Sequence, residues 1–271
     1  MKKLLALFAI MSVLCSLSAQ KVNENVILYG KEQLTGFTIN IDNATKDIVE
    51  GALADKFENQ FGMKGSKKKG FRVYENQSCT TFGDARYDIY FNAETVGKKK
   101  SQTVQLTLVV STGNMNFISF SSDPRTSRNI VSFLEGVPSD VEAYKTKLRI
   151  NELEQQLKNL KKERESLEKE KTKTNDRIAK TNDEIKKTAD RIEKKTDEIE
   201  RLQEQFNKNL DPTVSEQISQ AVKDKQSMQK NHTNAQKSLL KLNNSIVKLN
   251  NKLDENAKAI EKCENELKSL K

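Results

Sequence analysis

The sequence predicts two unlike parts in one chain, an α+β domain followed by a long antiparallel helical hairpin. Three observations support this fold class: a short basic and apolar N-terminus, a block rich in aromatic residues and glycine, and a C-terminal tract with heptad spacing of apolar residues. Phe206 is the only aromatic residue after Tyr144. The C-terminal tract is therefore expected to bury one apolar stripe against another helix instead of forming a three-dimensional core.

The first nineteen residues have the pattern of a secretory signal peptide. Lys2 and Lys3 precede an apolar run that is too short to span a bilayer and ends in small residues. We expect residues 1–19 to be removed, so that the mature chain begins at Gln20. The alternative, acylation at Cys15, is disfavoured because Leu14 stands where a small residue is expected. No transmembrane segment is expected after removal of the signal, which predicts a periplasmic or extracellular (secreted) protein.

Residues 20–139 are expected to form the α+β domain. Alternating apolar residues and glycine turns predict one strand, a helix capped by Asn43 that ends near Gly62, four antiparallel strands, and a final helix. The predicted strands are 36–41, 71–75, 87–92, 103–110 and 116–120, and the final helical spacing covers 127–134.

This order of elements resembles the TATA-binding-protein-like domains of secreted proteins from the Bacteroidota. The resemblance covers residues 22–140 only, and the leader ending Ser-Leu-Ser-Ala-Gln is similar to leaders of the same group. What the resemblance implies is a fold. Because a fold alone does not specify an activity, it does not imply DNA binding.

Residues 140–271 are expected to form the coiled-coil hairpin, introduced by Pro138 with Ser139 as helix cap. One heptad series runs from residue 150 to 206 and contains three near copies of a seven-residue unit, starting at 174, 181 and 188. A second series runs from 214 to 270, out of phase with the first. Asp211 and Pro212 suit an N-cap and a first helical turn, so we predict that the chain reverses at about 207–213.

Two antiparallel registers satisfy the heptads. One pairs Arg164 with Asn256 and Ile185 with Ala235, and the other shifts the first arm by seven residues, to Lys171 and Ile192. The alternative to an intramolecular hairpin is a bundle between chains, and this alternative leaves a homo-oligomer open.

The residues that carry chemistry are few. His232 falls on a core position without a neighbouring nucleophile or ligand pattern, and is interpreted as a tolerated polar core residue. Cys79 and Cys263 are either a disulfide in an oxidising compartment or two unpaired thiols. The sequence lacks CxxC and zinc-ligand spacing. We therefore expect no enzyme activity, no cofactor and no metal site.

Two lysine runs in predicted loops are candidate anion-binding sites: Lys67, Lys68 and Lys69, and Lys98, Lys99 and Lys100. The alternative is that they are solvated loop tips. The net charge of +9 is spread over interleaved positive and negative residues, so a nucleic-acid partner is not expected.

Together these patterns favour an exported adaptor or spacer that engages a protein partner in the envelope through its coiled-coil arm. A module that binds polyanions or the envelope surface through lysine loops 67–69 and 98–100 is the alternative hypothesis. An enzyme or enzyme inhibitor within 22–140 would need a pocket that sequence does not reveal.

Overall fold

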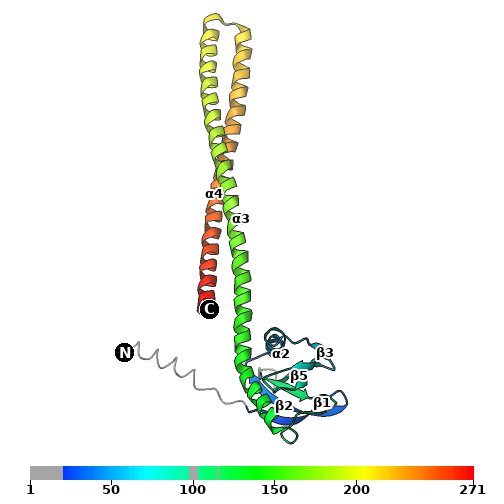
Figure 1. The fold of residues 1–271 in the computed structure, drawn as a ribbon. Helices are drawn as coiled ribbons and strands as arrows, with labels where there is room; N and C mark the ends of the chain where they lie inside the picture. The colour runs from blue at the N-terminus through cyan, green and yellow to red at the C-terminus, as the bar shows by residue number, and fades with distance from the viewer. Residues whose placement is uncertain (1–20, 98–102, 115) are drawn as a thin grey trace, which may run out of the picture. The chain divides into compact units, whose positions relative to one another are not determined.

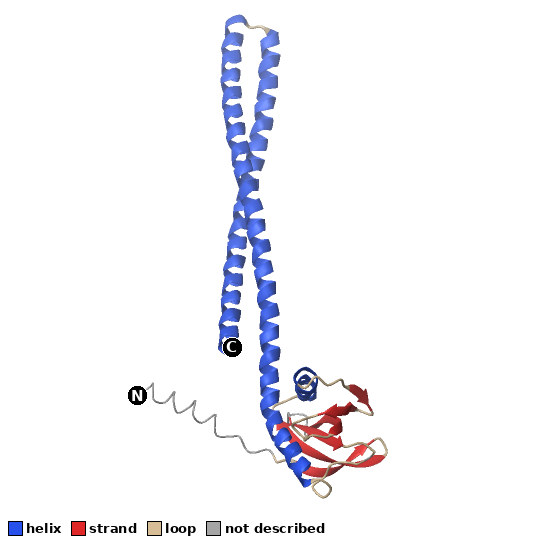
Figure 2. Cartoon of the chain, in the orientation of Figure 1, coloured by secondary structure: helices blue, strands red, loops and turns tan. Residues whose placement is uncertain are grey.

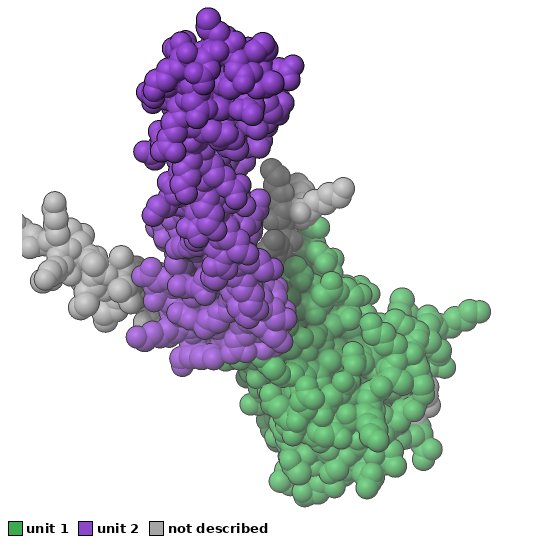
Figure 3. Space-filling model, turned by 90° about the horizontal axis from the view of Figure 1, so that it is seen from above, with its two compact units in different colours: residues 1–149 green, residues 150–271 purple. Residues whose placement is uncertain are grey.

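The computed structural model describes residues 21–97, 103–114 and 116–271, so the predicted signal peptide lies outside the described residues. The chain divides into two compact units, residues 1–149 and 150–271, which Figure 3 shows in green and purple. All strands of the described chain belong to the first unit, as Figure 2 shows in red. The predicted fold class, an α+β domain followed by a helical hairpin, is confirmed.

The first unit is built on one antiparallel sheet of six strands, labelled in part in Figure 1, in the order β1-β2-β6-β5-β4-β3. The sheet is built from long strands paired in register, with Phe37 opposite Leu108 and Leu108 opposite Phe91 at its centre. The strands are β1 (Asn23–Tyr29), β2 (Glu32–Asp42), β3 (Ser66–Lys68), β4 (Phe71–Ser78), β5 (Arg86–Val96) and β6 (Thr103–Ser111).

Four of the five predicted strands are confirmed, and one is wrong. Residues 116–120 form only a single bridge, between Ser111 and Phe117. The serines explain the difference: Ser119 accepts backbone N–H groups from Ser122 and Asp123 at its carbonyl, a local turn that competes with strand pairing. The sequence also missed β1 and β3, which are the two edge strands of the sheet.

One face of the sheet is covered by α2 (Lys46–Asp55), its π-helical continuation η2 (Lys56–Gln60), and the start of α3. Phe57 lies at the centre of this core, with ring centroids 5.1 Å from Tyr74 and 5.6 Å from Phe133. Thr45, and not Asn43, caps α2: its side chain accepts the N–H of Ile48. The cap prediction was wrong because Asn43 occupies a left-handed turn position, with φ of 55°. The predicted helix end near Gly62 is confirmed.

The other face of the sheet holds a smaller apolar cluster. The ring of Tyr29 in β1 lies 5.5 Å from that of Phe71 in β4 and 5.4 Å from that of Tyr90 in β5. These strands are not neighbours, so the sheet must curl strongly for the rings to meet. Gly36 permits the curl, because a Cβ at this position would lie 2.7 Å from a methyl group of Val109.

Helix α3 (Pro124–Asn209) is continuous through Pro138, so the predicted helix start at Ser139 is wrong. Proline removes the N–H that would bond the carbonyl of Leu134. Packing outweighs this loss, since Leu134, Val137 and Val141 are all fully buried around the proline. The helix begins instead at Pro124, and Asp123 caps it: the Asp123 side chain accepts the N–H of the third helical residue, Thr126.

Helix α4 (Pro212–Leu270) runs back along α3 after the turn at Leu210 and Asp211, as Figure 1 shows in yellow to red. The carboxylate of Asp211 accepts the N–H of Thr213 at 2.9 Å, and Pro212 occupies the first turn. Leu210 takes the left-handed conformation, with φ of 48°, which ends α3. The predicted reversal at 207–213 is confirmed.

Candidate interaction surfaces

The seam between the two arms follows the predicted heptads. Every position of both series is buried or half-buried except Arg164, which is exposed and paired with Glu168. At the open end of the hairpin, Leu153, Cys263 and Leu267 form an apolar cluster. The structure therefore confirms the stripe, and the Arg164 side chain departs from it only in that its charge reaches solvent.

Asn256 shows which of the two predicted registers is present. Its side-chain Nδ2 donates to the carbonyl of Leu160 at 3.1 Å and to a carboxylate oxygen of Glu163 at 3.2 Å. Further along, Glu184 and Ala235 line the same hollow. These contacts correspond to the register that places Arg164 and Ile185 next to Asn256 and Ala235, respectively. Asn256 Oδ1 is buried without a protein partner.

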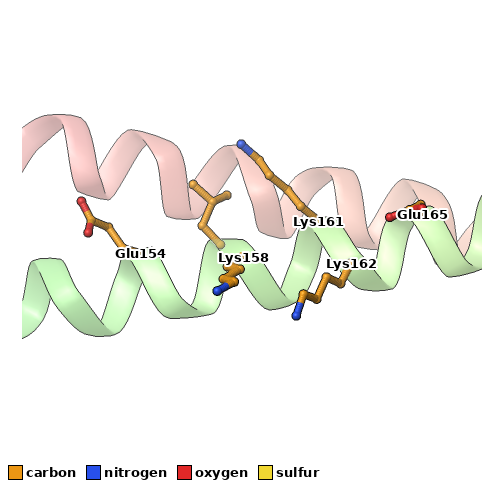
Figure 4. Close-up of a pocket in the computed structure, with 6 residues that line it drawn as sticks. Glu154, Lys158, Lys161, Lys162 and Glu165 are labelled. Atoms are coloured by element: carbon orange, nitrogen blue, oxygen red, sulfur yellow. The ribbon is translucent and has the colours of Figure 1, made fainter.

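The outer faces of the arms carry ion pairs instead of a charged stripe. Lys161 bonds Glu264 across the arms at 3.0 Å, and Lys271 bonds Glu154 at 2.9 Å. Figure 4 shows the shallow depression between these pairs, with Lys158 and Lys162 pointing away from α4. Because the depression is open to solvent and lined mainly by charged side chains, it does not enclose a small ligand.

Two exposed apolar pairs stand out among the described side chains. On α4, Leu240 and Val247 are 63% and 58% exposed and lie seven residues apart, which places them on one helix face. On the first unit, Val26 and Leu28 of β1 are 68% and 66% exposed, next to the half-exposed Phe120. Neither pair was recognised in the sequence, because none of the four residues belongs to a predicted strand or to either heptad series.

The lysines of the first predicted anion site are individually paired. Lys68 bonds Glu75 at 2.6 Å, which raises the pKa of that lysine, while Lys67 and Lys69 lie 4.0 Å from carboxylates of Glu50 and Glu32. Lys69 also lies 4.4 Å from the centre of the Tyr29 ring. Because each of these lysines lies close to a carboxylate, the positive electrostatic potential that an anion would meet is reduced. Lys98, Lys99 and Lys100 lie outside the described residues.

Both cysteines are buried free thiols, each inside its own unit. Burial raises the pKa of Cys79, which lowers its reactivity at neutral pH. The Cys263 thiol donates to the carbonyl of Leu153 at 3.3 Å. In the structure these side chains therefore act as small apolar groups of the two cores.

His232 lies at a half-buried position of α4. His232 Nε2 lies 3.0 Å from the amide of Gln236 one turn away on the same helix. No group of three or more His, Cys, Asp or Glu residues within 21–97, 103–114 and 116–271 is arranged to hold a metal ion.

A half-buried polar network that the sequence did not indicate lies on the helix-covered face of the sheet. Glu58 of η2 accepts from Arg72 Nε and from the Tyr74 hydroxyl, both at 3.0 Å. Burial, followed by the bond to Glu58, raises the pKa of Tyr74 well above its ordinary value. The contacts are 14 and 16 residues apart, so only the tertiary fold brings them together. The network ties η2 to β4.

A charged crevice lies between α2 with η2 and residues 140–147 of α3. Asp55 bonds Lys147 at 2.6 Å, which lowers the pKa of Asp55, and Lys56 bonds Asp140. These paired charges fix the helices against one another.

Family models, curated proteins and solved structures were compared with this chain, and none of them matches it. Among the described residues, no helix combines the length and the apolar character needed to cross a membrane.

Proposed function

We propose that this protein is an exported adaptor or spacer that engages an acidic protein partner of the cell envelope through its helical hairpin. The observation that carries the proposal is the face of α4 around Leu240 and Val247. These two side chains are more than half exposed, whereas large apolar groups on a solvated helix are normally confined to the seam.

Charge favours one class of partner for this face. Between Asp224 and Asp254, α4 contains six lysines and no acidic residue. The lysines are at positions 225, 230, 237, 241, 248 and 252. A partner surface with acidic side chains around an apolar centre would complement this segment in both charge and hydrophobicity.

The rest of the described chain supports a binding role over catalysis. The depression on α3 is open to solvent, and the ion pairs of Glu58 with Arg72 and of Asp55 with Lys147 join elements of the first unit. The interleaved ion pairs keep the rest of the hairpin surface solvated. Specific association is therefore expected at the uncharged, exposed positions. Export rests on the predicted signal peptide.

Photocrosslinking in the cells that produce the protein tests this function. A photoreactive amino acid at position 240 should give one discrete adduct. The mass of this adduct should differ from the mass of two crosslinked copies of the chain. The same probe at exposed position Lys186 on α3 serves as the control and should give none. Val247→Asp should abolish the adduct. Absence of an adduct at position 240, or an adduct unaffected by V247D, would reject the proposal.

A further inference from the structure

The two edges of the six-stranded sheet are protected to very different degrees. Natural sheets guard free edges with short strands, lysine, proline or bulges, because unpaired backbone groups recruit further strands. Edge strand β3 follows this rule: it has three residues, two of them Lys67 and Lys68. Edge strand β1 has seven residues, Asn-Glu-Asn-Val-Ile-Leu-Tyr, without lysine or proline.

The side chains of β1 add an apolar surface to this open edge. Val26 and Leu28 point to the face on which Phe37 lies, because their partners on β2 follow the same alternation. Phe120 extends the surface: its ring packs against Phe37 at 5.8 Å, and its backbone N–H is bonded to Glu24. The one acidic group of the strand is thereby engaged, and the other two β1 side chains on this face, Val26 and Leu28, are apolar.

From this edge we infer that β1 pairs with β1 of a second copy of the chain, which joins two six-stranded sheets into one antiparallel sheet across a two-fold axis. The sequence of β1 is self-complementary in that arrangement. A two-fold axis perpendicular to the sheet keeps each residue on its own face, and residues paired across the axis must share a face. The residue numbers of two paired positions must therefore add up to an even number. With Ile27 on the axis, Val26 lies opposite Leu28 of the partner strand, and Leu28 lies opposite Val26.

This register gathers four exposed aliphatic side chains on one face of the joined sheet. Cross-strand aliphatic pairs of this kind are the unit that stabilises antiparallel sheets. The alternative register, with Val26 on the axis, places Leu28 against Glu24 and gathers fewer apolar contacts. A second copy therefore fits the edge better than a strand without this pattern, and a dimer would carry two hairpins.

The oligomeric state of the mature chain, from Gln20 onwards, tests this inference by sedimentation velocity across a range of concentrations. The wild type should sediment as a concentration-dependent dimer. Val26→Lys with Leu28→Lys should weaken self-association by more than about tenfold, because like charges then face each other across the axis. Leu240→Lys with Val247→Lys replaces an equally exposed apolar pair on α4 and should leave the dimer intact.

Charge reversal then tests the pairing of the two β1 strands. Val26→Glu with Leu28→Glu should be monomeric alone, yet form a heterodimer when mixed with the lysine variant, since each lysine then faces a glutamate. A monomeric wild type at all concentrations, or a lysine variant that stays dimeric, would overturn the inference. So would failure of the two charged variants to pair when far-UV circular dichroism shows both folded. The photocrosslink at position 240 is independent of this result, so either proposal can fail alone.

Discussion

Replacing Asn256 by leucine is expected to stabilise the hairpin, although it removes two hydrogen bonds. The side chain is 5% exposed, and its Oδ1 is buried without a partner in the protein. Leucine at this position would gain about 1.5–3 kcal/mol from burial and remove an unpaired polar atom that costs about 1–3 kcal/mol.

The losses are smaller than these gains. The bond to the Leu160 carbonyl contributes about 0.5–1.5 kcal/mol, and the bond to the Glu163 carboxylate about 1.5–3 kcal/mol. Neither acceptor is stranded by the change, because the carbonyl lies within a helix and Glu163 is exposed. The midpoints of these ranges leave a net gain of about 1 kcal/mol.

Denaturant unfolding followed by far-UV circular dichroism measures this change. The matched control is Leu249→Asn, the reverse substitution in the same seam at 4% exposure, which should lose more than about 2 kcal/mol. A loss of stability of 1 kcal/mol or more in N256L would refute the reasoning, and would mean that the two hydrogen bonds outweigh the burial of a leucine side chain.

Three further outcomes are expected. Asp123→Ala should cost about 1 kcal/mol of stability through loss of the α3 N-cap. The hydrogen bond to the helix lowers the pKa of Asp123, so the stabilisation by this cap is present above the unfolded pKa and should fade as the pH drops below about 4. Asp123→Asn should keep the cap without that pH dependence. Ultraviolet titration should find that Tyr74 and Tyr90 ionise above the ordinary range, because burial raises the pKa of both, and Tyr74→Phe should leave the titration of the other tyrosines unchanged. Gly136→Ala should stabilise α3 by roughly 0.8–1 kcal/mol, because open space surrounds that position. Thermal unfolding of Gly51→Ala should show a loss of stability, because the new Cβ would lie 2.8 Å from Tyr144.

The hairpin was predictable because its signals are local and repeated. Each heptad position independently reports the seam, and Asp211 with Pro212 supplies a helix start where the phase of the heptads changes. The register was not predictable, because both candidates set a polar residue opposite Asn256. Only the contact with Leu160 distinguishes them, and it depends on side-chain direction that periodicity does not record.

The α+β domain was predictable where strands alternate over a buried face, as in β5 and β6. The prediction of this domain failed where tertiary contacts override local signals. Buried residues on both sides hold α3 through Pro138, and the serines after residue 116 use their backbone groups in a turn. The Glu58 network joins distant segments, so no spacing could reveal it. The resemblance to TATA-binding-protein-like domains stays a prediction.

The continuity of α3 has a consequence for dissecting this protein. The helix contributes Val137 and Val141 to the first core and Leu153 to the second, and residues 149 and 150 between them are helical. A protease therefore meets no connecting loop at the boundary of the units, and limited digestion should cut first at Leu210, whose side chain is 72% exposed. Fragments designed by truncation at Arg149 would end on a frayed helical turn with unpaired carbonyl groups.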